Sequence, residues 1–145
     1  MTASESATEN LVEIRDLHFA YGARKVLNGI DLSIQRGKVV AILGVSGCGK
    51  TTLLRLLGGQ IKPQSGSVKV AGQEVPALDA TDLYALRRDM GMMFQMGGLY
   101  SDMSVFDNVA FPMRELTDLS EQMIHDLVLM KLHAVGLRGT AAMMT

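Results

Sequence analysis

The residues from Gly44 to Thr51 read Gly-Val-Ser-Gly-Cys-Gly-Lys-Thr and fit the pattern G-x-x-x-x-G-K-[ST] at every fixed position. Glycines let a loop turn several backbone N–H groups inward around a polyphosphate, because they lack a Cβ atom and adopt unusual backbone angles. Lys50 is then placed to reach the β- and γ-phosphates, and Thr51 to offer its hydroxyl to Mg²⁺. The spacing predicts a binding loop for a nucleoside triphosphate.

The segments on either side of this loop support that prediction. The run from Val39 to Leu43 is apolar without alternation, which is typical of a strand buried on both faces. Thr52 to Leu57 predicts a helix that ends at Gly58-Gly59, and such a helix would point its positive end at the bound anion. A chance glycine-rich turn before a helix is the alternative, and the preceding strand argues against it.

The expected nucleotide site includes residues beyond the fixed positions of the motif. Its members are Gly44, Ser46, Gly47, Cys48, Gly49, Lys50, Thr51 and Thr52. The side chain at position 48 is free in the motif, so we expect Cys48 to contribute its backbone N–H. A redox-sensing thiol is the alternative role for this residue.

The segments before the loop predict antiparallel strands. Leu11 to Phe19 fits a first strand, which Tyr21-Gly22 would break. The turn pair Asn28-Gly29, followed by apolar residues that alternate from Ile30 to Ile34, predicts a hairpin with one buried face.

The segments after the loop predict further strands and helices. They are a short strand from Ser67 to Val70, an amphipathic helix from Asp79 to Arg88, an apolar strand from Gly91 to Phe94, a loop from Met96 to Ser104, and a helix capped by Ser120 that runs to about Val135. The chain is therefore predicted to be an α/β protein of the P-loop type, with an antiparallel β-subdomain at its N-terminus.

Composition excludes several classes of protein. The chain has 145 residues, with 14 basic and 15 acidic side chains, which predicts one domain without the basic patch of a nucleic-acid-binding protein. A single cysteine suits a reducing compartment, and no apolar run is long enough to span a membrane. Residues 1–10 resemble neither a signal nor a transit peptide and are expected to be a flexible tail before a domain at 11–145.

Methionines concentrate in the second half of the chain. Of 11 methionines, all but the first fall between Met90 and Met144. Adaptable filling of the core is the favoured interpretation, and a deformable surface for a partner is the alternative.

Other residues refine the class of nucleotide-binding protein. The Asp-x-x-Gly and Asn-Lys-x-Asp motifs of GTPases do not occur, and the chain instead resembles the ATP-binding subunits of ABC transporters. The resemblance rests on the Gly44 to Leu54 stretch, on Pro63-Gln64-Ser65-Gly66, and on two further residues. It implies that Tyr21 stacks on adenine and that Gln95 contacts Mg²⁺ and the attacking water. An ordinary strand-end tyrosine and a polar strand end are the alternatives.

Within the family, the chain looks most similar to the ATPases of Mla-type intermembrane phospholipid transport. The stretches that carry this similarity are Leu53–Ile61, Phe94–Ser101, Val105–Glu115 and Met130–Gly139. The resemblance implies that the region after Gln95 docks on a transmembrane permease, with Leu99, Tyr100, Val105 and Phe111 as candidate interface residues. Burial in the core is an equally good explanation for these four.

The chain departs from the family pattern in its last part. It has no Leu-Ser-Gly-Gly signature, no Walker B strand and no switch histidine, so it looks like the N-terminal part of an ABC ATPase. The resemblance implies an ATP- and Mg²⁺-binding subunit that energises phospholipid transport, pairs with a second ATP-binding subunit, and lies in the cytoplasm on the inner face of the membrane through the permease. A nucleotide-binding or interaction remnant without a transport role is the alternative. A P-loop kinase is disfavoured.

Overall fold

The computed structural model describes residues 9–95 and 97–145. The described residues form two compact units, one before and one after the boundary between Met90 and Gly91, and each contains its own cluster of buried side chains. Most of the expected N-terminal tail lies outside the described residues, but Asn10 already belongs to the first strand. The two units are described separately below.

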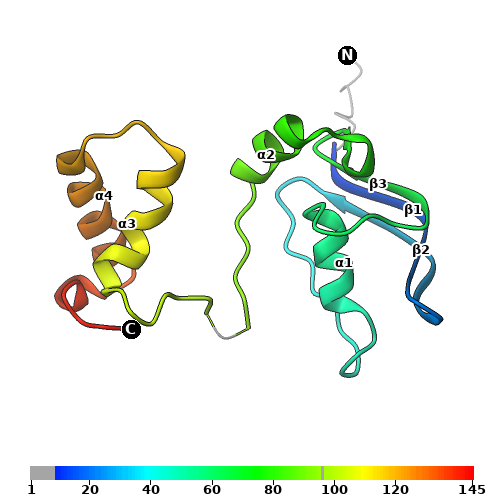
Figure 1. The fold of residues 1–145 in the computed structure, drawn as a ribbon, viewed down its shortest axis with the longest axis horizontal. Coiled ribbons are helices and arrows are strands. Elements are labelled where there is room, and N and C mark those ends of the chain that lie inside the picture. Colours follow the sequence, from blue (N-terminus) through cyan, green and yellow to red (C-terminus); the bar gives the residue numbers. More distant parts are fainter. Residues whose placement is uncertain (1–8, 96) are drawn as a thin grey trace, which may run out of the picture. The chain divides into compact units, whose positions relative to one another are not determined.

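The first unit contains a four-stranded antiparallel sheet in the order β2-β1-β3-β4. The expected antiparallel opening of an α/β fold is therefore confirmed (Figure 1). The strands are β1 (Asn10–Tyr21), β2 (Arg24–Gln35), β3 (Ser65–Val70) and β4 (Gln73–Glu74), and the helices are α1 (Lys50–Leu57), the 3₁₀ turn η1 (Val75–Ala77) and α2 (Ala80–Arg88).

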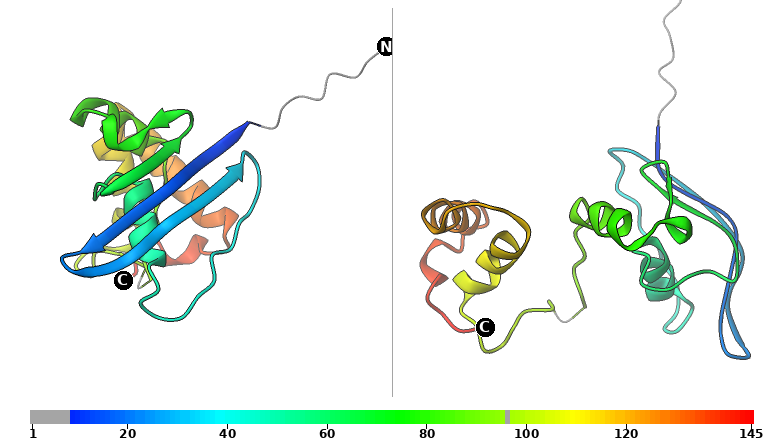
Figure 2. Two further views of the ribbon diagram at one scale, coloured as in Figure 1. Left: turned by 90° about the vertical axis from the view of Figure 1, so that its right-hand side faces the viewer. Right: turned by 45° about the horizontal axis from the view of Figure 1, so that its top comes forward.

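Helix α1 lies against one face of this sheet (Figure 2). Ile14 and Leu17 of β1 and Val68 of β3 are fully buried, and they belong to the same cluster as Leu53 and Leu56 of α1. Burial of a large aliphatic side chain contributes about 1.5–3 kcal/mol. This cluster therefore fixes the position of α1, whose first residue is Lys50.

The hairpin forms at a different place from the one predicted. Its turn is Gly22-Ala23, between the paired residues Tyr21 and Arg24, whereas Asn28 and Gly29 lie within β2. Leu17 pairs with Ile30 and His18 with Asn28, so Gly29, with φ 68°, is the extra residue of a β-bulge. The Asn-Gly pair marks a residue with positive φ, and this sheet uses it to bend a long strand rather than to reverse the chain.

The predicted strand from Val39 to Leu43 is wrong for this structure. Residues 38–44 adopt no regular secondary structure, and the exposed fractions are 101% for Val39 and 89% for Leu43. The expected strand from Gly91 to Phe94 is likewise irregular, with Met93 at 89% exposure. A run that is apolar on both faces needs neighbouring strands, and the sheet contains only β1 to β4 within the described residues.

The second unit is an antiparallel helical pair followed by a short turn. Its elements are α3 (Val105–Leu116), α4 (Glu121–Ala134) and the 3₁₀ turn η2 (Arg138–Thr140). Ala110 of α3 packs with Ile124, Val128 and Leu132 of α4, and Ser120 caps α4 as predicted. The helix was expected to run to about Val135; it ends at Ala134, and Val135 is its C-cap residue and is 69% exposed.

Arg114 joins α3 to α4 by a small ionic network. Its guanidinium donates to Glu121 at 2.9 Å and to Asp107 at 3.2 Å. A hydrogen bond from Arg114 lowers the pKa of Glu121, and a hydrogen bond from Ser104, followed by one from Arg114, lowers the pKa of Asp107. The two carboxylates thus favour the ionised form in the folded unit.

Exposed methionines contradict the favoured interpretation of their role. Those with exposed side chains are Met90, Met92, Met93, Met123, Met130, Met143 and Met144. Met113 packs partly buried against the helical cluster, so core filling accounts for only part of the set. Among the described residues, no helix is both long enough and apolar enough to cross a bilayer.

Exposure of residues 39–43 predicts self-association. We expect Val39→Lys to increase the soluble fraction of the isolated chain several-fold, because a charge on an exposed extended segment opposes strand pairing between copies. The thermal midpoint should not change, since the side chain has no packing to lose. The soluble fraction after centrifugation and a thermal scan measure both quantities. Val68→Lys, at a site with 0% exposure, is the destabilising control. Equal solubility of Val39→Lys and wild type would contradict this expectation.

The Arg114 network predicts a pH-dependent stability. The lowered carboxylate pKa values stabilise the unit fully above the ordinary pKa values of Asp and Glu, and this stabilisation is lost as the pH falls through the folded values. We expect Arg114→Met to lower the thermal midpoint at pH 7, and the difference from wild type to shrink below about pH 4. Arg138→Met is the matched control. A difference that stays constant down to acid pH would argue against an ionic cause.

Candidate nucleotide-binding site

Gly49 places the start of α1 against the sheet. It is the N-cap residue with φ 105° and ψ 4°, and no side chain caps the helix. A Cβ atom at this position would lie 2.9 Å from Val26 Cγ1 and 3.0 Å from Leu27 Cδ2 of β2. Glycine is required here both for the backbone angles and for the space. The first turn of α1 contains no acidic residue, so its positive end is not neutralised by its own sequence.

The rest of the loop also depends on missing Cβ atoms. A Cβ atom on Gly44 would meet Cys48 Sγ at 2.5 Å, and Gly47 has φ 78°. Within the loop, the N–H of Cys48 donates to the carbonyl of Val45 at 3.3 Å. These contacts make a tight turn of backbone next to a helix N-terminus, which suits an anion.

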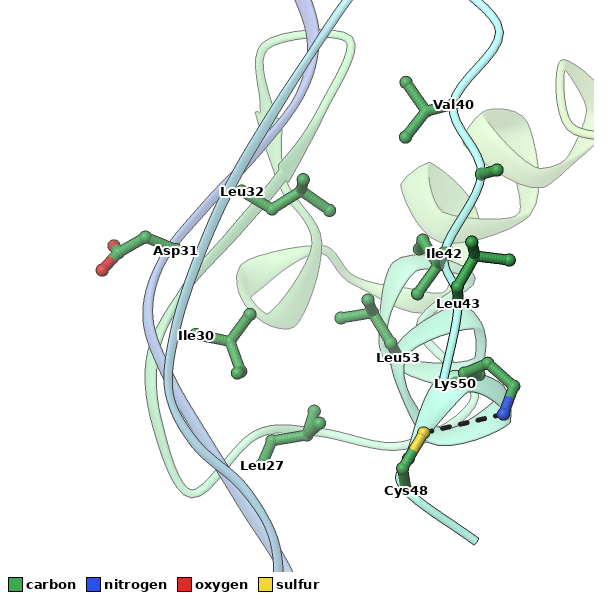
Figure 3. Close-up of a pocket in the computed structure, with 12 residues that line it drawn as sticks. Leu27, Ile30, Asp31, Leu32, Val40, Ile42, Leu43, Cys48, Lys50 and Leu53 are labelled. Carbon is green, nitrogen blue, oxygen red and sulfur yellow. Dashed lines mark hydrogen bonds between the residues drawn. The ribbon is translucent and has the colours of Figure 1, made fainter. Parts of the chain in front are cut away.

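Lys50 lies folded across this loop. Its Nζ donates to the carbonyl oxygens of Gly44 at 2.7 Å and Val45 at 2.9 Å. It also donates to Cys48 Sγ at 3.6 Å, as Figure 3 shows. Carbonyl oxygens compensate only part of the ammonium charge, so a phosphate oxygen would be a stronger partner for the same group. The structure therefore places the expected cation over the expected phosphate loop.

Tyr21 interacts with residues of α1, and its expected contact with adenine remains a prediction. A hydrogen bond with the Thr52 side chain, with a smaller contribution from Arg55, holds the pKa of the Tyr21 phenol below its ordinary value. Its ring meets Phe19 edge-on, with centroids 4.8 Å apart, and the residue is 47% exposed. Thr52 itself is buried, at 7% exposure.

Two arginines near the loop were missed by the sequence analysis. Arg24 Nη2 would lie 3.6 Å from a Cβ atom on Gly47, and Arg55 interacts with Tyr21. Arg24 directly follows the hairpin turn, so a correct placement of that turn would have revealed it. Arg55 lies on the same helix as Lys50, one turn and a half further along.

An apolar cavity of about 400 Å³ adjoins the loop (Figure 3). Leu27 and Leu32 of β2 and Leu53 of α1 face it, while Asp31 points away. Its other walls come from residues 40–43 and from Cys48, Gly49 and Lys50. Aliphatic walls suit side-chain packing better than a nucleotide, so this cavity is a poor candidate for a phosphate site.

Gln95 belongs to the second unit, where it lies exposed in a turn. Its expected contact with Mg²⁺ and water therefore remains a prediction. Thr51 is exposed beside Lys50, which leaves its hydroxyl accessible for the same ion. No group of three or more His, Cys, Asp or Glu side chains that could hold a metal occurs in residues 9–95 and 97–145.

Comparison with known families decides the class of the protein. The sequence model of the ABC transporter family matches residues 27–143, which is most of the chain. The chain belongs to this family. Proteins of the ABC family bind ATP, which agrees with the loop geometry described above.

Individual relatives agree with this assignment. The chain is 51% identical, over 140 residues, to the intermembrane phospholipid transport system ATP-binding protein MlaF of Escherichia coli K12, and the match covers 97% of the chain and 52% of that protein. It is 51% identical to MlaF of Haemophilus influenzae over 94% of the chain and 52% of that protein. The chain thus spans about half the length of these curated ABC relatives.

Solved structures share the fold. The ABC protein cbiO1 from Clostridium perfringens, part of the transporter complex cbiONQ, superposes with a TM-score of 0.81 at 29% identity, over 94% of this chain and 54% of that one. A dimeric bacterial ABC transporter cassette gives a TM-score of 0.79 at 27% identity, over 90% of this chain and 60% of that one. The expected fold is confirmed.

Tyr21 offers a test of the adenine contact. We expect Tyr21→Ala to weaken ATP binding about fivefold or more, because stacking and edge contacts of an aromatic ring contribute about 0.5–1.5 kcal/mol beyond its buried area. Tyr21→Phe should remain close to wild type, since it keeps the ring and loses only the hydroxyl contact with Thr52. Calorimetric titration measures both affinities. Equal losses for the two variants would show that the ring is not the adenine platform.

Proposed function

We propose that this chain binds ATP with Mg²⁺ through residues 44–52 and serves as the ATP-binding part of a subunit that energises an ABC transporter. The observation that carries the proposal is the glycine cradle with Lys50 across it. Gly49 caps α1 without a side chain, and Lys50 Nζ lies over the loop carbonyls. This arrangement places backbone N–H donors and the Lys50 ammonium group next to one another at the N-terminus of α1.

Each residue of the loop has a defined task in this proposal. Backbone N–H groups from Gly47 to Thr51 would donate to the phosphates, that of Cys48 in exchange for its bond to the Val45 carbonyl. Lys50 would exchange its own carbonyl contacts for β- and γ-phosphate oxygens. Thr51 would hold Mg²⁺ through its hydroxyl, with Gln95 as a second contact to the ion and to the attacking water. When bound, Mg²⁺ neutralises the charge that develops on the transferred phosphoryl group.

The transported substrate is proposed to be phospholipid, moved across the cell envelope. Support comes from the 51% identity to MlaF of two bacteria, proteins that are named for intermembrane phospholipid transport. A transmembrane permease and a second ATP-binding subunit are the proposed partners, and a dimeric cassette is among the similar solved structures. In this proposal the chain lies in the cytoplasm, held to the membrane by the permease.

Lys50 provides the experiment that tests nucleotide binding. We expect Lys50→Ala to weaken ATP affinity about ten- to hundredfold, since a hydrogen bond to a charged group contributes about 1.5–3 kcal/mol. Calorimetry with ATP and Mg²⁺ measures the affinity, and circular dichroism checks that both proteins are folded. Lys62→Ala removes an exposed lysine elsewhere in the same unit and is the matched control. Unchanged affinity in folded Lys50→Ala would refute the assignment.

Co-purification with the permease tests the transport role separately. We expect the chain, co-expressed with its cognate permease subunit, to remain bound to that subunit through purification into lipid nanodiscs. A chain that binds ATP but never associates with the permease would instead be the nucleotide-binding remnant that the sequence left as the alternative.

A further inference from the structure

Arg24 and Tyr21 lie opposite each other at the tip of the hairpin between β1 and β2. They are paired residues on either side of the turn Gly22-Ala23, so their side chains leave the sheet on the same face. Tyr21 interacts with Thr52 of α1, so this is the face that the helix covers. The hairpin tip therefore places an aromatic ring and a guanidinium group on the side of the phosphate loop.

The guanidinium group of Arg24 lies over the middle of the loop. Its Nη2 is 3.6 Å from the position that a Cβ atom on Gly47 would occupy. Gly47 has φ 78°, so a side chain there would be strained by its backbone and would also contact Arg24. Glycine at this position therefore leaves the space next to the guanidinium group open.

Arg24 has no partner for its charge among the residues that the structure describes. Its side chain is exposed and forms neither a hydrogen bond nor an ion pair with any of them. Arg114, by contrast, pairs with Glu121 at 2.9 Å. The first turn of α1 contains no acidic residue either. The donors of Arg24 are therefore available to an anion held by the loop.

Arg55 is the other arginine near the hairpin tip, and its position has a structural explanation. It is the basic residue in the last turn of α1, where the end of a helix favours a positive charge. It also interacts with the Tyr21 side chain. Arg24 has neither of these roles.

Three side chains meet the phosphate loop in an order that matches the order of groups in a nucleotide. Along the chain of the loop, they are Lys50 at Gly44 and Val45, Arg24 at Gly47, and Tyr21 at Thr52. In the proposed nucleotide site, Lys50 takes the β- and γ-phosphates, and Tyr21 takes the adenine ring. The α-phosphate is the anionic group between these two parts of the nucleotide, and Arg24 is the cation between the two side chains.

We propose that Arg24 binds the α-phosphate of the nucleotide through its guanidinium group. This inference rests on the proposed function, because it requires a nucleotide in the loop. A planar guanidinium offers two parallel N–H donors to a phosphate, which a lysine ammonium does not. The contact is common to ATP and ADP, since both nucleotides carry the α-phosphate.

Three variants of the full chain test this contact. Arg24→Ala removes the guanidinium group, and Arg24→Lys keeps the charge but loses the paired donors. Lys25→Ala removes the same charge from the next position, whose side chain points to the opposite face of β2, and is the matched control. Calorimetry measures the Kd of ATP and of ADP, each with Mg²⁺, and a thermal scan without nucleotide checks the fold.

Both nucleotides should respond alike. We expect Arg24→Ala to weaken ATP and ADP by the same factor of about ten, the lower end for a hydrogen bond to a charged group, because solvent screens an exposed guanidinium. Arg24→Lys should lose about threefold, since it keeps only the charge. Lys25→Ala should bind both nucleotides as wild type does. The thermal midpoint without nucleotide should stay at the wild-type value in all three variants.

Several outcomes would overturn the proposal. Wild-type affinity of Arg24→Ala for both nucleotides would show that no contact forms, and an equal loss in Lys25→Ala would show general electrostatic attraction instead. A loss confined to ATP would place Arg24 at the γ-phosphate. A loss that accompanies a lowered thermal midpoint would show a merely structural role.

The nucleotide assignment itself is separated from this contact by Lys50→Ala. A wild-type chain that binds neither nucleotide would overturn both the Arg24 contact and the proposed function. Weakened binding in Lys50→Ala with wild-type binding in Arg24→Ala would overturn only the Arg24 contact. The reverse result would contradict the role of Lys50 and support that of Arg24.

Discussion

The close approach of Gly49 to strand β2 is the constraint on which the phosphate loop depends. A Cβ atom at Gly49 would lie within 3.0 Å of side chains on β2, so only glycine lets the loop reach the sheet and turn directly into α1. Burial of Leu53 and Leu56 then sets the rotation of the helix, and Lys50 follows from that rotation. The positions of the loop backbone and of Lys50 therefore depend on packing between β2 and α1. The core of the first unit stabilises this packing.

The phosphate loop is anchored unequally on its two sides. On its C-terminal side, Thr52 and Leu53 are buried, and α1 belongs to the main core. On its N-terminal side, residues 39–43 are irregular and exposed, although they are as apolar as a core strand. The hydrogen bonds from Lys50 to the carbonyls of Gly44 and Val45 therefore also have a structural role, because they link the exposed N-terminal side of the loop to α1.

The sequence allowed the C-terminal end of α1, the bounds of α2 and α4, and the overall class to be predicted, because caps and glycines act locally. It did not allow the partners of a segment to be predicted. Val39–Leu43 has the composition of a central strand, but a strand exists only where another strand supplies hydrogen bonds. Asn28-Gly29 signals positive φ without saying whether the chain turns or bulges. Helix α3 was missed altogether, since Pro112 lies inside it and disfavours a helix on local grounds.

A comparison of free energies indicates how many residues of the loop a bound nucleotide could order. A ligand at a hundred times its dissociation constant stabilises the binding form by about 2.7 kcal/mol. Fixing the backbone of one residue costs about 1–2 kcal/mol, so this stabilisation covers the ordering of only about two residues. Nucleotide binding can therefore settle the few residues at Gly44 and Val45 that Lys50 already contacts, but not the whole segment from Val39 to Leu43. Further ordering of residues 39–43 requires burial of their aliphatic side chains against a protein surface. Residues 40–43 already line a cavity with Leu32 and Leu53, so such a surface would have to adjoin this cavity. In the proposed function, the affinity of the loop for phosphate would therefore depend on packing along β2, at a site that the phosphate itself does not touch.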